Sequence, residues 1–304
     1  MPKTELYMRL KKLYPSAQGM AICGNLLFQL YHTGKCAVYD LKSKSPEALA
    51  AFPLGSSNDG VPDSNYTNHS NQCMFSDMHI GDNPLPLLYV TCGCGTEGDD
   101  NGFYYRCAVE NIELELSSSG TVTGGRSSLV QTVSYKNDGI GDTSFETPCW
   151  GCPAWFVDSK NCCLYMFSSR YRTTAAFAQY KDRNKYIITR FSLPDPTAGE
   201  NFVILTAKDI LDQFTAPFDI FFTQGGMISG NKLYYTFGCG SGYDGIYPDG
   251  MRIYDLERKQ PCGSYDFSGS CFAHEEIESC SFYNGKLLIN TNASPEIGIF
   301  SISE

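Results

Sequence analysis

Short runs of apolar and aromatic residues alternate with turn-forming residues along most of the chain. Three segments show the pattern most clearly. Each has a strand-like run, a Gly-Asn or Asn-Gly turn, a second run, a loop and a third run, and they cover residues 18–41, 224–256 and 278–302. Such turns between β-branched and aromatic runs are typical of β-hairpins. The repetition predicts one supersecondary unit that recurs along the chain.

A leucine after each hairpin turn gives these units a common register. Two weaker copies add two more such leucines, so that the five anchors are Leu27, Leu88, Leu164, Leu233 and Leu287. The residues nine positions before an anchor are expected to share one place in the first strand of each unit, and they are Gln18, Trp155, Gln224 and Glu278. The turn before Leu88 is longer, which leaves Ser76 or Asp77 as the equivalent residue.

Five units predict an all-β fold, a five-bladed β-propeller that occupies residues 1–304 as a single domain. The expected blades are residues 18–55, 73–135, 152–207, 222–269 and 275–304. The last unit has only three strands, and residues 4–14 supply the fourth, which closes the ring and covers an exposed sheet edge. Two β-sandwich domains divided near residue 150 are the competing interpretation, but sandwiches do not require the same unit five times.

The third unit contains one departure from strand structure. Its fourth strand is expected at residues 200–207. Asp209 is expected to cap a single helical turn that carries Ile210, Leu211 and Phe214.

The repeated turns and the strands that follow them resemble known propeller repeats. Residues 24–27 read GNLL, residues 230–233 read GNKL and residues 284–287 read NGKL, while residues 253–256 read IYDL. They are similar to the divergent β-propeller repeats of uncharacterised bacterial and phage-associated proteins. That resemblance implies the architecture and no specific functional family.

Five-bladed glycosidases are similar in gross form, and their activity depends on acidic residues in the inner strands. Glu278 and Asp77 match such positions in this sequence. Gln18, Trp155 and Gln224 depart from that pattern.

Composition and charge narrow the classes of partner. The net charge of −10 argues against nucleic acid as a partner, because binding phosphates requires a positive field. No stretch reaches the roughly 18 apolar residues that span a bilayer, which predicts no membrane insertion. The first residues lack the apolar core of a signal peptide. We therefore expect a cytoplasmic protein, or an envelope or phage-associated one if the sequence is part of a longer chain.

The fourteen cysteines have no pattern of a metal site. The pairs Cys92/Cys94 and Cys149/Cys152 have spacings seen in zinc sites, but the four histidines show no complementary spacing. We expect reduced, mostly buried thiols, no metal ion and no cofactor.

Propeller geometry nominates a binding site. The first strand of each blade lines the central channel, and the entrance lies beside the loops that join second and third strands. The expected ligand-binding residues are Gln18, His32, Asp77, Trp155, Arg170, Gln224, Tyr243, Glu278 and Asn292. Amides, carboxylates and aromatic faces suit a carbohydrate or another polar small molecule.

Three other functions compete with this one. Gln18, Gln224 and Glu278 could instead bond to one another and fill the channel. A glycan-cleaving hydrolase or lyase would use Glu278 and a second carboxylate, with Asp77 as the candidate. A structural scaffold would bind a protein partner elsewhere on the surface. A binding module is preferred to an enzyme, because most clusters of acidic residues are solvated charges.

Overall fold

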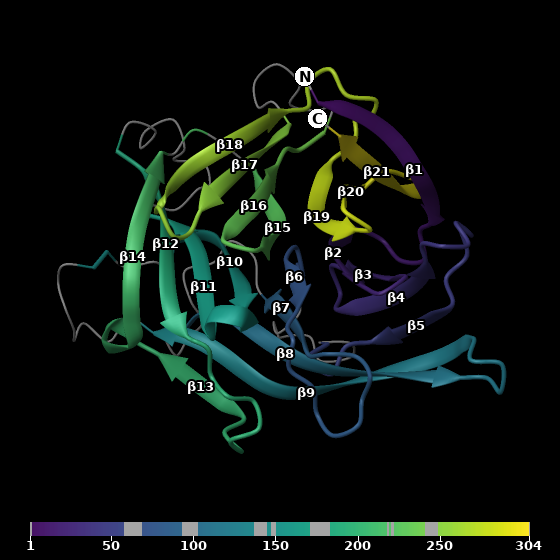
Figure 1. Cartoon of the computed structure of the whole chain (residues 1–304), viewed down its shortest axis with the longest axis horizontal. Coiled ribbons are helices and arrows are strands. Elements are labelled where there is room, and N and C mark those ends of the chain that lie inside the picture. The colour runs from purple at the N-terminus through teal and green to yellow at the C-terminus, as the bar shows by residue number, and fades with distance from the viewer. Residues whose placement is uncertain are drawn as a thin grey trace.

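Five sheets, antiparallel except for one parallel strand pair, are arranged around a central axis (Figure 1). The computed structural model describes residues 2–57, 69–92, 103–136, 145–146, 150–170, 183–217, 219, 222–240 and 249–303. For residues 103–105 and 150–153 only the backbone is described. The prediction of an all-β, five-bladed β-propeller is confirmed.

Each blade begins with the strand nearest the axis and continues outward. Blade 1 contains β2 (Ala17–Cys23), β3 (Leu26–Tyr31), β4 (Lys35–Asp40) and β5 (Ala50–Pro53). Blade 2 contains β6 (Cys73–Phe75), β7 (Leu88–Cys92), β8 (Phe103–Leu116), β9 (Val122–Lys136) and β13 (Phe202–Leu205). Blade 3 contains β10 (Trp150–Asp158), β11 (Cys163–Ser169), β12 (Lys185–Ser192) and β14 (Ile210–Pro217).

The other two blades complete the ring. Blade 4 contains β15 (Thr223–Ser229), β16 (Lys232–Phe237), β17 (Gly250–Asp255) and β18 (Gln260–Asp266). Blade 5 contains β19 (Ile277–Tyr283), β20 (Lys286–Thr291), β21 (Glu296–Ser303) and β1 (Lys3–Lys11). Two short 3-10 helices, η1 (Ser159–Asn161) and η2 (Ala207–Asp209), are the helical elements of the described residues, and neither could span a membrane.

The hydrophobic core is divided into five clusters, one between each pair of neighbouring blades. The two faces of one strand contribute to different clusters. In β3, Leu27 packs toward blade 5, and the next residue, Phe28, packs toward blade 2. Both faces of the middle strands are therefore buried, which explains why these strands read as continuous apolar runs instead of strict alternation.

The N-terminal strand closes the ring as expected. Strand β1 pairs with β21, from Lys3 opposite Ser303 to Lys11 opposite Glu296. The inward side chain of Leu10 is completely buried between blades 5 and 1. These pairings join the beginning of the chain to the last blade.

The connection between β12 and β14, the third and fourth strands of blade 3, differs from the prediction. Residues 202–205 form β13, which pairs in parallel with β9 as a fifth strand of blade 2, so the expectation of a fourth strand for blade 3 at residues 200–207 is wrong. The expected helical turn at residues 210–214 is also wrong, because these residues belong to β14. The turn η2 precedes them, and Thr206 caps it while Asp209 accepts the Thr206 N–H at 2.7 Å.

The closing strand predicts a specific loss of stability. Replacing Leu10 with Ala should lower the free energy of unfolding by about 2–5 kcal/mol, because it leaves a cavity between two blades. Leu6 lies on the same strand but is 52% exposed, so Leu6→Ala should change stability by less than about 0.5 kcal/mol. Urea denaturation of both variants measures the difference. Equal effects would mean that β1 does not contribute to the core.

Candidate functional site

The central channel is lined by the first strands β2, β6, β10, β15 and β19 (Figure 1). These strands approach closely at glycines. The Gly19 N–H donates to the Ser70 carbonyl at 2.9 Å, and a Cβ atom on Gly19 would lie 2.8 Å from that oxygen. A Cβ atom on Gly225 would collide with the Asn71 carbonyl. Backbone contact between blades therefore narrows the channel at this level.

Buried amides and one carboxyl group connect blades 1 and 5 inside the channel. Gln18 Nε2 donates to Glu278 Oε1 at 3.5 Å. Asn290 Nδ2 donates to the Gln18 carbonyl at 2.7 Å and to Gln29 Oε1 at 3.0 Å. Gln18 and Glu278 therefore lie together as predicted, and their bond matches part of the alternative in which Gln18, Gln224 and Glu278 bond to one another. Gln224 does not take part in this bond, because its amide donates to the Gly238 carbonyl.

Two channel residues were missed by the sequence analysis. Gln29 interrupts the apolar run of β3, and its amide donates to the carbonyls of Gln18 and Leu30 at 2.8 and 2.9 Å. Gln72 precedes β6, and its Oε1 accepts the Gly226 N–H at 2.6 Å, which links blade 2 to blade 4. Gln29 could have been found in the sequence, because it is the one polar residue within the apolar strand β3.

Several buried polar atoms of the channel have no partner among the described residues. Three are amide oxygens, one is a carboxyl oxygen, one is an amide nitrogen and one is a hydroxyl oxygen: Gln18 Oε1, Asn71 Oδ1, Asn290 Oδ1, Glu278 Oε2, Gln72 Nε2 and Ser279 Oγ. Buried polar groups are nearly always hydrogen-bonded to protein or to ordered water. These atoms therefore indicate a place for water or for a ligand that both donates and accepts hydrogen bonds.

Burial sets the charge of the channel carboxyl group. Glu278 is 0% exposed, and burial raises its pKa well above the usual value, with the nearby Glu276 acting in the same direction. Lys12 and Asn292 oppose the shift. Since burial is the dominant cause, we expect Glu278 to stay protonated in the folded protein at pH values well above the ordinary pKa of a glutamic acid.

A group of three side chains lies at the entrance end of the channel, where the first strands begin; we call Lys12, Glu276 and Asn292 the rim cluster. Lys12 Nζ donates to Asn292 Oδ1 at 2.6 Å, and Asn292 Nδ2 donates to Glu276 Oε2 at 2.9 Å. Asn292 Oδ1 also accepts the Ala17 N–H at 3.2 Å, so Asn292 ties the cluster to β2. Partial burial lowers the pKa of Lys12, although Glu278 and Glu276 counteract this.

Two further groups lie at or near the entrance. The rings of His32 and His69 meet with their Nδ1 atoms 3.1 Å apart. Burial raises the pKa of the Cys239 thiol to about 11, with Glu276 and Asp249 adding to the shift, so this cysteine is a poor nucleophile at neutral pH. Gln224 contributes little to the opening, because its amide donates to the Gly238 carbonyl at 2.8 Å and the side chain is buried.

Two predicted site residues lie elsewhere. Asp77 belongs to the connection between β6 and β7 at the opposite end of the channel, and its N–H donates to Ser159 Oγ at 2.9 Å. Trp155 is fully buried between blades 2 and 3, with its ring centre 6.1 Å from that of Phe191. Both errors come from turn length. Val157 and Leu164 pair across seven positions, whereas Ile22 and Leu27 pair across five, so counting nine back from Leu164 stops short of the position equivalent to Gln18.

Of the remaining predicted residues, Arg170 lies after β11 and makes two hydrogen bonds to the Glu146 carboxylate. Its guanidinium is therefore already engaged. Tyr243 lies outside the described residues. The structure thus brings together Gln18, Glu278 and Asn292, and it places His32 at the same end of the molecule.

The described residues contain no group of three His, Cys, Asp or Glu side chains arranged to hold a metal ion. The described cysteines are free thiols, and several are buried, including Cys36, Cys73, Cys107 and Cys280. Burial raises the pKa of these four thiols, which keeps them protonated.

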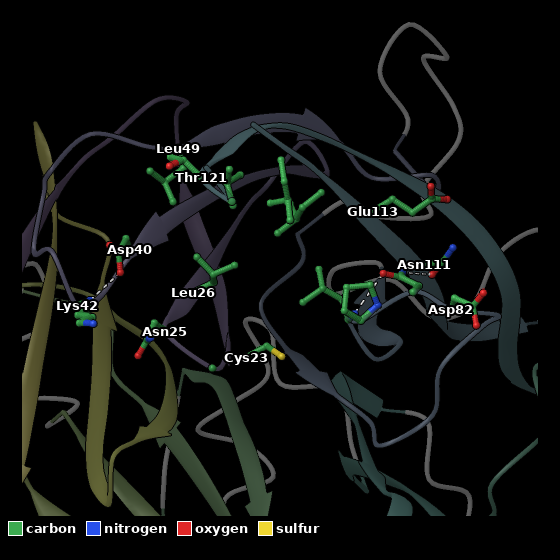
Figure 2. Close-up of a pocket in the computed structure, with 18 of the residues that line it drawn as sticks. Cys23, Asn25, Leu26, Asp40, Lys42, Leu49, Asp82, Asn111, Glu113 and Thr121 are labelled. Atoms are coloured by element: carbon green, nitrogen blue, oxygen red, sulfur yellow. Dashed lines mark hydrogen bonds between the residues drawn. The ribbon is translucent and has the colours of Figure 1, made fainter. Parts of the chain in front are cut away.

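A separate pocket of about 920 Å³ lies between blades 1 and 2, at the end opposite the rim cluster (Figure 2). Its walls come from the turns of blade 1, from residues 80–85 in the connection between β6 and β7, and from the long hairpin formed by β8 and β9. Sequence reasoning missed this pocket, because the unusual length of one hairpin does not reveal which neighbour the hairpin contacts.

No family model and no curated protein sequence matches this chain. Solved structures do match it. The tail fibre of Staphylococcus aureus phage P68 is 11% identical, with a TM-score of 0.52, and the match covers 99% of this chain and 53% of the fibre chain. Glutaminyl cyclase from Myxococcus xanthus is 10% identical, with a TM-score of 0.49, over 100% of this chain and 98% of that one.

A third match is the β-propeller domain of Cps50 (Swd1) from Myceliophteria thermophila. It is 10% identical, with a TM-score of 0.41, over 97% of this chain and 85% of that one. Similarity at these identities concerns the fold alone.

The buried carboxyl group predicts an unusual pH dependence of stability. An acid whose pKa is higher in the folded than in the unfolded state stabilises the fold fully at low pH, and this contribution is lost as pH rises above the unfolded value. Glu278→Gln replaces the carboxyl group with an amide of nearly the same shape that does not titrate. Its free energy of unfolding should therefore rise relative to wild type by up to about 1.4 kcal/mol per pH unit above about pH 4.5.

Urea denaturation of both proteins between pH 4 and pH 8 measures this difference. A difference that stays constant across the range would mean that Glu278 has the same pKa in the folded and unfolded states.

Proposed function

We propose that this chain is a non-catalytic binding module that takes a polar ligand of the carbohydrate class at the entrance of the channel. The observation that carries the proposal is the rim cluster at the channel entrance, which presents an ammonium, a carboxylate and an amide that are only partly buried. Sugar hydroxyls both donate and accept hydrogen bonds, so they can bond to all three groups. Behind the rim cluster, the buried amide oxygens of Gln18, Asn71 and Asn290 have no partner among the described residues.

The position of Glu276 and Glu278 favours one alternative, a glycan-cleaving hydrolase. A general acid of such an enzyme needs a raised pKa, and Glu278 has one. Glu276 would be its second carboxylate, because Asp77 lies at the opposite end of the channel. Binding remains the better proposal, since the Glu278 side chain is inaccessible and a general acid must come within hydrogen-bonding distance of the bond that it cleaves.

The other alternative is an interaction scaffold. The phage P68 tail fibre matches the fold of this chain with a TM-score of 0.52, and this chain spans about half of that fibre chain. A fibre component would bind a partner through its outer surface, and its partner binding would not depend on the rim cluster.

A glycan array followed by calorimetric titration with the best glycan tests the proposal. Asn292→Ala and Glu276→Gln should each weaken binding by about tenfold, which corresponds to the loss of one or two hydrogen bonds. Asp77→Asn is the matched control, because that carboxylate is exposed at the other end of the channel, and its affinity should equal that of wild type.

Three outcomes would overturn the proposal. The first is the absence of binding to any glycan on the array. The second is a loss of affinity in Asp77→Asn equal to that in Asn292→Ala and Glu276→Gln. The third is the release of reducing sugar from the bound glycan, abolished by Glu278→Gln, which would establish the hydrolase instead.

A further inference from the structure

The pocket between blades 1 and 2 exists because one hairpin extends beyond its own blade. Strands β8 and β9 have 14 and 15 residues, and the outer part of β9 packs against β5 of blade 1. Gly125 lies directly under the Phe52 ring, where a Cβ atom would come within 2.6 Å of a ring carbon. The hairpin therefore acts as a fixed wall across the gap between the two blades (Figure 1).

A buried carboxylate holds this wall in place. Glu110 accepts hydrogen bonds from the N–H groups of Gly55 and Ser56 at 2.8 and 2.9 Å, and from the hydroxyls of Ser56 and Ser127. Each carboxylate oxygen thus has partners, which makes burial of the charge tolerable. With the wall anchored at this point, the pocket is largely preformed.

Aliphatic side chains supply the apolar lining of the pocket. They come from both blades, and they include Leu26, Leu49, Ile80, Leu114, Leu116 and Val122. No aromatic side chain lines the pocket, so the stacking surface that usually binds a sugar ring is missing among these residues. The lining suits a flexible aliphatic chain better than a flat or ring-shaped ligand.

Acidic groups lie at both ends of this apolar region (Figure 2). Asp40, Lys42 and Asn25 lie together at one end, and Asp82, Glu113 and Asn111 lie at the other. Three carboxylates against one lysine give the lining a net negative charge. Asp82 is exposed and makes no hydrogen bond or ion pair with the described residues, whereas Glu113 is paired with Arg126.

We propose that this pocket binds an aliphatic diamine, that is, a linear hydrocarbon chain with a protonated amino group at each end. The chain would lie against the leucines and valine of the hairpin and of blade 1, and the ammonium groups would meet Asp82 at one end and Asp40 at the other. The volume of about 920 Å³ is within the range of small-molecule sites. This site is separate from the rim cluster, so the proposal does not rest on carbohydrate binding.

Calorimetric titration of the full chain with three compounds of equal length tests the proposal: octamethylenediamine, octylamine and octanediol. The diamine should bind most tightly, the monoamine more weakly, and the neutral diol without measurable affinity. Raising the salt concentration should weaken diamine binding, because the charged groups at the pocket ends are reached by solvent.

Variants locate the bound diamine. Asp82→Asn should weaken its binding by about fivefold and Asp40→Asn by a similar factor, as expected for partly solvated ion pairs. Leu116→Ala removes an exposed apolar side chain of the wall and should also weaken binding. Glu257→Gln is the matched control, since Glu257 is an exposed carboxylate on the corresponding turn of blade 4, and its affinity should not change.

Absence of saturable diamine binding would overturn the proposal, as would equal affinity for the diol or equal loss in Glu257→Gln. Glycan binding measured on Asp82→Asn separates the two sites. If both proposals hold, this variant loses affinity for the diamine and keeps its affinity for the glycan.

Discussion

The whole ring depends on the close approach of its first strands around the axis. At Gly19 and Gly225 the backbones of different blades come so near that a side chain would collide with a neighbouring carbonyl group. This approach leaves no room for large apolar residues inside the channel. Amides and a neutral carboxyl group fill it instead, and the amides donate hydrogen bonds to backbone carbonyls such as that of Gln18.

The apolar and polar parts of the molecule therefore have different tasks. The five hydrophobic clusters lie between blades and resist their separation. The channel network connects blades through hydrogen bonds, as Gln72 does when it accepts the Gly226 N–H of blade 4. Because several of its oxygens lack partners, the network is the part of the protein whose energy depends most on what occupies the channel.

Much of the fold was predictable because local signals agreed with one another. Repeated hairpin turns and anchor leucines predicted five blades. The N-terminal strand, which belonged to no other blade, was predicted to complete the last one. Gln18 and Glu278 were correctly paired because their hairpins have equal turn lengths. Trp155 and Asp77 were misplaced because their hairpins have longer turns, and a residue count cannot detect where extra residues are inserted. The partner of β13 and the contact of the β8–β9 hairpin depend on tertiary packing, which no local pattern encodes.

The pairing of β1 with β21 also determines how the ring would respond to mechanical load. Lys3 stands opposite Ser303, so the two ends of the chain emerge side by side (Figure 1). A force that draws these two ends apart would act across the ladder and open its hydrogen bonds one after another, rather than shearing all of them together. A propeller tethered through both ends would therefore unzip at its closing strand first, while the remaining blades kept their own sheets.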